Sequence, residues 1–196
     1  MADTQPYRPK KRGYETAADM LRSLVPIVVL VVLFAYFCMP KSDNKINTID
    51  PQDNITSMAE YGAFSIVAPK ALDKSWKPTS SKLLRDDSNQ LSTPTGLTIG
   101  YVTPKMKFAR FTIRQGVPEA VLKASVDDAT VTDDPAGNAV QIAGRSWTPI
   151  TTDKGRGYVN VAGSGAASIV IVLVGSASYD ELKELATALQ PVAKKS

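Results

Sequence analysis

Residues 168–174 read SIVIVLV, and this stretch decides how the C-terminal part of the chain folds. Every side chain from Ile169 to Val174 is apolar, so both faces of an extended segment would be apolar. Such a segment is typical of the middle of a sheet that is covered on both sides. It is too short to cross a membrane as a helix, because a helical span needs about 20 residues. We therefore predict a central strand here.

The residues that follow predict a helix packed on this sheet. Residues 178–181, SYDE, have the spacing of a capping box, in which a serine hydroxyl and a glutamate carboxylate each bond a backbone N–H of the first turn. Apolar side chains then recur along one helical face at Leu182, Leu185, Ala186 and Leu189. We expect Pro191 to end this helix.

The residues before the central strand alternate strand patterns with turns. In residues 108–114 apolar and polar side chains alternate with the period of a half-buried strand. One face holds Ala109, Phe111 and Ile113, and the other holds Arg110, Thr112 and Arg114. Further strands are expected at 63–67, 76–84, 97–103, 140–142, 146–150 and 157–161, and a short helix at 118–125. The sequence therefore predicts an α+β domain in which helices flank an antiparallel sheet.

A second apolar stretch lies near the N-terminus. Residues 24–39 read LVPIVVLVVLFAYFCM and carry no charged side chain. With Arg22 placing its guanidinium among the headgroups, we predict a transmembrane helix over residues 20–39. A cleaved signal peptide is the alternative, but residues 35–39 lack small residues at the usual spacing. A buried core helix is a further alternative.

The charges on either side of the apolar stretch predict its orientation. Five basic residues precede or begin it, namely Arg8, Lys10, Lys11, Arg12 and Arg22. Because basic flanks stay in the cytoplasm, residues 1–19 are predicted to be a cytoplasmic tail. Residues 40–60 are then a tether, and residues 61–196 an extracytoplasmic domain. The predicted localisation is the cell membrane, crossed once.

Composition excludes several kinds of chemistry. The chain has no histidine, and its one cysteine is Cys38 within the apolar stretch. Histidine triads and histidine bases are therefore excluded, and zinc or haem sites would lack their usual ligands. A net charge of +4 over 196 residues is too small to indicate nucleic-acid binding. We predict no enzyme, no cofactor and no nucleic-acid partner.

A candidate binding site comes from four basic residues. Arg110 and Arg114 share the polar face of their strand, and Lys105 and Lys107 lie in the turn before it. Together they could contact an anionic surface of lipid headgroups or wall polymers. The alternative is a solvated strand face. The acidic pairs at 86–87, 127–128 and 133–134 are interpreted as loop charge, and Trp76 and Trp147 as core residues.

Several motifs carry a family resemblance. Asp19-Met20-Leu21 lead into the apolar stretch, and the later part carries SIVAPKALDKSW (65–76), GYVTP (100–104), IAGRSW (142–147) and GSASYDELKELATAL (175–189). Together they resemble an actinobacterial single-pass membrane protein family of unknown function. The resemblance implies an exported domain and brings no catalytic residues. The order of strands with a closing helix is also similar to the Mog1/PsbP-like fold.

The functional prediction combines anchor, domain and composition. We expect a membrane-anchored extracytoplasmic binding or accessory protein of the cell envelope, including a subunit of a larger membrane complex. Its partners would be the bilayer, through residues 20–39, and a protein of the membrane or envelope. The alternative is a ligand- or lipid-binding module of the envelope.

Overall fold

The computed structural model describes residues 17–38, 46–70, 72–86, 92–127, 129–133 and 137–194. The chain divides into two compact units, residues 1–45 and 46–196, which are described one at a time. Most of the predicted cytoplasmic tail, residues 1–16, lies outside the described residues. The same holds for residues 39–45, which include the first part of the predicted tether.

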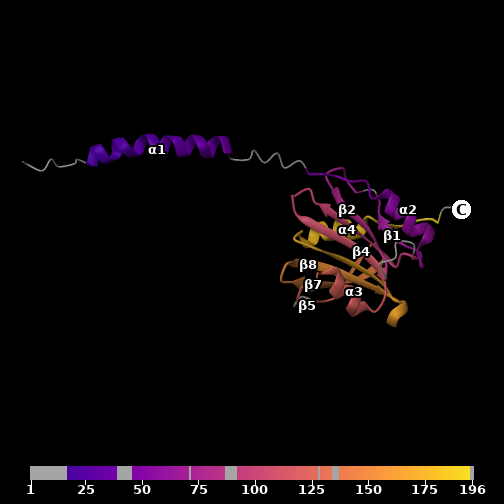
Figure 1. Cartoon of the computed structure of the whole chain (residues 1–196). Helices are drawn as coiled ribbons and strands as arrows, with labels where there is room; N and C mark the ends of the chain where they lie inside the picture. The colour runs from indigo at the N-terminus through magenta and orange to yellow at the C-terminus, as the bar shows by residue number, and fades with distance from the viewer. Residues whose placement is uncertain are drawn as a thin grey trace, which may run out of the picture. The chain divides into compact units, whose positions relative to one another are not determined.

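The first unit contains one helix, α1, over Ala17–Cys38 (Figure 1). It begins three residues before the predicted start at residue 20, and Pro26 lies in its interior. The carbonyl of Arg22 therefore lacks its usual helical N–H partner. The large apolar side chains described between Met20 and Phe34 are exposed. Among the residues that the structure describes, no helix meets the length and hydropathy required of a membrane span.

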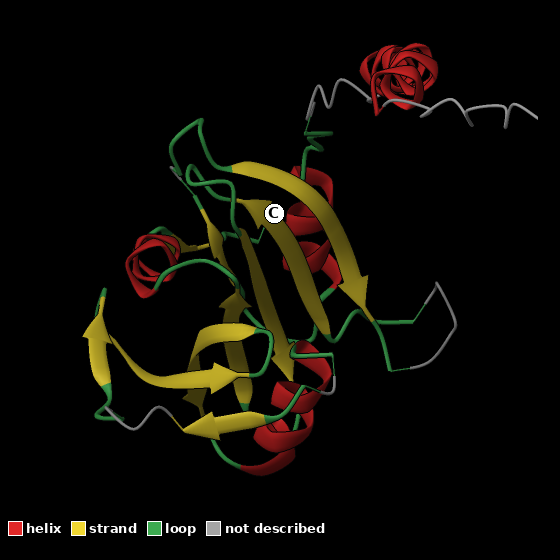
Figure 2. Ribbon diagram, turned by 90° about the vertical axis from the view of Figure 1, so that its left-hand side faces the viewer, coloured by secondary structure: helices red, strands yellow, loops and turns green. Residues whose placement is uncertain are grey.

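Within the described ranges, the strands and three further α-helices belong to the second unit (Figure 2). Its helices are α2 (Gln52–Tyr61), α3 (Pro118–Ser125), α4 (Tyr179–Thr187) and the 3-10 turn η1 (Gly165–Ala167). Its strands are β1 (Val67–Pro69), β2 (Lys77–Leu84), β3 (Gly96–Val102), β4 (Phe108–Gln115), β5 (Val131–Asp133), β6 (Val140–Ile142), β7 (Arg145–Thr152), β8 (Gly155–Ala162), β9 (Ile169–Gly175) and β10 (Leu189–Pro191). The predicted α+β class is confirmed.

The main sheet is antiparallel and has the order β2-β3-β4-β9-β8-β7-β5, with β6 paired to the first part of β7. Strand β9 carries the SIVIVLV stretch and pairs with β4 on one side and β8 on the other. Its residues from Val170 to Val174 are all buried, which confirms the predicted central strand. A separate two-stranded ribbon joins β1 to β10.

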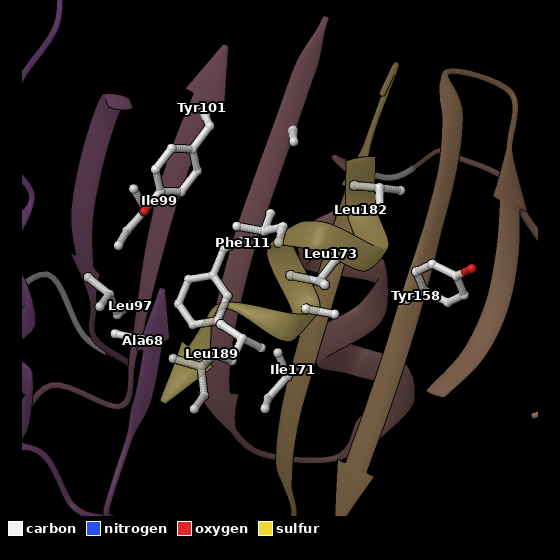
Figure 3. Close-up of a cluster of buried hydrophobic side chains, with 14 of the residues drawn as sticks. Ala68, Leu97, Ile99, Tyr101, Phe111, Tyr158, Ile171, Leu173, Leu182 and Leu189 are labelled. Atoms are coloured by element: carbon white, nitrogen blue, oxygen red, sulfur yellow. The ribbon is translucent and has the colours of Figure 1, made fainter. Parts of the chain in front are cut away.

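Helices cover both faces of the sheet. On one face, α2, α4 and the β1–β10 ribbon enclose the larger core, which includes Phe111 of β4 and Leu173 of β9 (Figure 3). On the other face, α3 packs on β9 and β4 over Val170 and Val172. Because α3 is short, this second face is covered mainly over β9 and its neighbours. Trp76 and Trp147 are both buried, as predicted.

The start of the domain differs from the prediction. Residues 46–60, expected as tether, belong to the second unit. Helix α2 buries Ile55 and Met58 in the larger core, and the N–H of Ile49 donates to the carbonyl of Pro78 at 2.9 Å. Two buried side chains three positions apart are enough to dock a helix of ten residues, although the rest of the segment is polar.

Two further details differ from the sequence prediction. The closing helix ends at Thr187, so Leu189 and Pro191 lie in β10 and not in the helix. The capping box itself is present, with the Ser178 hydroxyl accepting from the Glu181 N–H. The strand predicted at 76–84 begins at Lys77 instead, and it accommodates Pro78 because β2 is an edge strand with an irregular register at that point.

Candidate functional site: a cationic groove beside helix α3

A groove of about 310 Å³ runs between α3 and the open face of β2, β3 and β4. We call it the α3 groove; it is lined by Ser80, Lys82, Leu84, Thr98, Arg110, Thr112, Arg114, Val121, Ala124, Ser125 and Asp127. The alternation of side chains along β4 explains why its polar residues line this groove. Ala109, Phe111 and Ile113 of β4 point into the larger core, so the residues between them face the groove.

Two hydroxyls, one half-buried on Thr98 and one buried on Thr112, form part of the groove floor. Thr98 of β3 and Thr112 of β4 are cross-strand partners whose Oγ1 atoms lie 3.1 Å apart. Thr98 donates its proton to the Phe111 carbonyl at 3.2 Å, so Thr112 is left to donate to Thr98. The floor is therefore polar but internally hydrogen-bonded.

Arg110 closes one end of the groove by joining β4 to the end of α3. Its Nη1 lies 2.9 and 3.0 Å from the two carboxylate oxygens of Asp127 and donates to the Ser125 carbonyl at 3.2 Å. The cation thus lies at the negative end of the helix dipole. Asp127 adopts the left-handed conformation common just after a helix, with φ of 52°. The hydrogen bond from Arg110 lowers the pKa of Asp127.

Arg114 closes the other end. Its Nη2 lies 2.7 Å from Oδ1 of Asp86, which also accepts from the Thr95 hydroxyl at 3.1 Å. These two hydrogen bonds lower the pKa of Asp86, with Arg114 contributing most. Since Arg114 lies four positions beyond Arg110 on the strand, their backbones lie about 13–14 Å apart.

Lys82 adds a third cation that sequence reasoning missed. It is exposed on β2, opposite Thr98. Among the residues that the structure describes here, three cations face two carboxylates, Asp86 and Asp127. The sequence predicted a strand at 76–84 that contains Lys82. It did not predict that this strand pairs with β3, and only that pairing places Lys82 beside the arginines.

Lys105 and Lys107 do not line the groove. They belong to the turn between β3 and β4, which we call the lysine turn (Thr103–Lys107). The structure therefore separates the predicted site into two places, with the arginines in the groove and the lysines in the turn. Strand periodicity could not show this separation, because it does not extend through a turn.

The lysine turn has an unusual residue at its tightest point. Met106 has a φ of 59° and a side chain that is 59% exposed. The N–H of Thr103 donates to the Lys107 carbonyl, so the loop has three residues and Met106 holds the left-handed position that glycine normally occupies. For a residue with a β-carbon this conformation costs about 1–2 kcal/mol.

Another hollow lies along α4. It measures about 570 Å³ and is lined by both acidic and basic side chains, among them Lys70, Asp180 and Lys183. Glu184 at this hollow accepts from Trp76 Nε1 at 2.9 Å.

Within the described part of the chain, no group of three or more His, Cys, Asp or Glu side chains could hold a metal ion.

Comparison with protein families identifies the chain. Residues 12–189 match the family described as "Protein of unknown function (DUF4245)". The chain belongs to the DUF4245 family. The resemblance to a family of unknown function is thereby confirmed, whereas the actinobacterial origin stays a prediction. No curated protein matches this DUF4245 chain.

Two solved structures show a weak likeness. They are described as MucB in complex with MucA(peri), and as the complex of Pseudomonas aeruginosa MucA/MucB. Each has a TM-score of 0.33 and 12% sequence identity, over 65% of this DUF4245 chain. The match spans 37% and 35% of those chains, so this protein corresponds to about a third of their length.

Proposed function

We propose that this protein is a non-enzymatic binding protein of the cell envelope. Residues 20–39 anchor it in the membrane, and the domain that begins at Ile46 lies outside and binds an anionic segment of an envelope partner in the α3 groove. The apolar run and its basic N-terminal flank support the anchor and its orientation. An accessory subunit of a larger membrane complex is one form of this role.

The observation that carries the binding role is that three cations line the described part of the α3 groove. Lys82, Arg110 and Arg114 line a groove whose paired carboxylates are Asp86 and Asp127. Those carboxylates are 69% and 63% exposed, so a partner carboxylate or phosphate can compete for the same guanidinium groups. The partner therefore needs anionic groups on an extended segment.

A binding role is favoured over catalysis by the contents of the groove. Ser80 and Lys82 both line it, but no hydrogen bond is described between the serine hydroxyl and the lysine ammonium. The chain has no histidine that could act as base instead. We further propose that the domain is Mog1/PsbP-like, because helices flank its antiparallel sheet on both faces.

The binding role is tested by photocrosslinking the full chain in its native membrane. A photoreactive residue replaces Ser80 in the groove, and a control chain carries it at Lys183, on α4. We expect a discrete protein adduct from position 80 that the control does not give. Lys82→Glu should remove this adduct, and the matched Lys183→Glu should preserve it.

Two outcomes would contradict the proposal. Identical adducts from positions 80 and 183 would mean that the groove is not a specific site. An adduct with the mass of a glycerolipid would favour the alternative role as a lipid-binding module.

A further inference from the structure

The lysine turn presents an apolar side chain between two cations. Lys105, Met106 and Lys107 are all exposed, and Phe108, the next residue, is 38% exposed. The turn is held by the N–H of Met106, which donates to the Thr103 carbonyl at 2.9 Å, and by the N–H of Lys107, which lies 3.2 Å from the Thr103 hydroxyl. Its conformation is therefore fixed before any partner arrives.

The described start of the domain lies at the same end of the sheet as this turn. The N–H of Ile49 donates to the carbonyl of Pro78, and the neighbouring Lys77 pairs with Val102, the last residue before the turn. Eight peptide steps join Cys38 to Ile46, which limits the distance between these two residues to about 29 Å. A membrane that held α1 would thus be within reach of this end of the domain.

We propose that the lysine turn is a second membrane contact and docks on an anionic lipid surface. Lys105 and Lys107 contact headgroup phosphates, and Met106 enters the boundary between headgroups and acyl chains. This inference rests on the proposed anchor at residues 20–39. A methionine suits the contact because its flexible thioether adapts to an irregular apolar surface.

Docking at this point would orient the α3 groove. Arg110 lies close to the turn along β4, and Arg114 lies further from it. The end of the groove at Arg110 would therefore be near the bilayer, and the end at Arg114 would open away from it. A partner segment would enter at Arg114 and run toward the membrane.

The test uses the full chain with Cys38→Ala and one new cysteine that carries a fluorophore sensitive to polarity. The labelled positions are Met106 in the turn, Ala166 at the opposite end of the sheet, and Leu30 in α1. Each protein is reconstituted in vesicles of phosphatidylcholine alone, or of equal parts phosphatidylcholine and phosphatidylglycerol. Quenching by lipids that carry a quencher in the acyl chain reports contact with the bilayer.

We expect quenching at position 106 in the anionic vesicles and none at position 166. Lys105→Glu with Lys107→Glu should lower the contact equilibrium at least about 30-fold, because each cation near an anionic surface contributes roughly a fivefold effect. The matched pair Lys70→Glu with Lys183→Glu, both exposed along α4, should leave it unchanged. Thermal unfolding of each variant confirms that the domain remains folded.

The label at Leu30 separates the two proposals. Quenching at position 30 without quenching at position 106 would overturn the membrane contact of the turn and leave the anchor intact. Absence of quenching at position 30 would overturn the anchor itself. A response of position 106 to a soluble polyglycerol phosphate, but not to vesicles, would also contradict docking on lipid.

Discussion

Met106 combines a left-handed backbone with an exposed apolar side chain, and neither property stabilises the fold. Met106→Gly should therefore raise the free energy of unfolding by about 0.5–1 kcal/mol, since relief of backbone strain exceeds the entropy that glycine adds to the unfolded chain. Urea denaturation measures this change. Lys105→Gly, in the same turn but without a positive φ, should destabilise the domain. A lower free energy of unfolding in Met106→Gly would contradict the claim that the backbone at Met106 is strained.

Arg110 of β4 and Asp127, just after α3, form an ion pair. A double-mutant cycle with Arg110→Gln and Asp127→Asn should give a coupling energy of about 0.5–1 kcal/mol, because both side chains are partly exposed to solvent. A control cycle that pairs Arg110→Gln with Asp180→Asn, on α4, should give almost no coupling. Equal coupling in both cycles would mean that the ion pair contributes nothing of its own.

For single residues, the sequence predicted the sheet face on which a side chain lies better than it predicted the residue with which that side chain pairs. The alternation in 108–114 placed Arg110 and Arg114 on the polar face, where they are found. It did not predict that Asp127 and Asp86, interpreted as loop charge, would pair with them. Such pairs join residues that are 17 and 28 positions apart, and local periodicity carries no information about them.

Among the elements, α2 was the one that sequence reasoning assigned to a tether. Met58→Ala should lower the free energy of unfolding of the domain by about 2–5 kcal/mol, because this side chain is fully buried in the larger core. The exposed Asp53→Ala in the same helix should change it by no more than about 0.5 kcal/mol. Chemical denaturation of both variants checks this. An unchanged free energy of unfolding in Met58→Ala would mean that α2 does not form part of the folded domain.

Helix α4 depends on a carboxylate whose pKa is lowered. Burial raises the pKa of Glu181, but the neighbouring Thr103, the hydrogen bonds from Ser178 and the charge of Lys105 together lower it below its ordinary value of 4.5. The stability that it contributes is present above pH 4.5, and is lost as the pH falls through the lower folded value.

Glu181→Gln removes this titration while preserving an oxygen acceptor for the cap. Between neutral pH and pH 3, the wild-type chain should therefore lose more stability than Glu181→Gln, as measured by urea midpoints across the pH series. Parallel loss in the two proteins would show that the carboxylate does not titrate below its ordinary pKa in the folded domain.

Elements with strong local signals were predicted well. The capping box, the alternation of β4 and the apolar run of β9 each follow from neighbouring residues. The end of α4 was not predicted, because Leu189 continues the helical stripe while its backbone pairs with Pro69 in the β1–β10 ribbon. A tertiary pairing overrode the local pattern there.

At the scale of the whole molecule, strand order is what the sequence could not supply. The α3 groove exists because β2 pairs with β3 at one edge, and because α3 is too short to cover that edge. The strand pairing and the position of α3 on the sheet do not follow from neighbouring residues, although the short helix itself does. The same topology carries Lys105 and Lys107 away from the arginines, so the single predicted patch becomes two surfaces with different proposed partners.

The central claim is that a membrane anchor holds this groove on the outer side of the cell. It is tested most directly by labelling intact cells with a sulfonated maleimide that cannot cross the membrane, in chains that carry Cys38→Ala and one new cysteine. We predict that Thr148→Cys, exposed on β7, is labelled in intact cells, whereas Lys11→Cys is labelled only after permeabilisation. Labelling of Lys11→Cys in intact cells, with Thr148→Cys protected, would contradict the account.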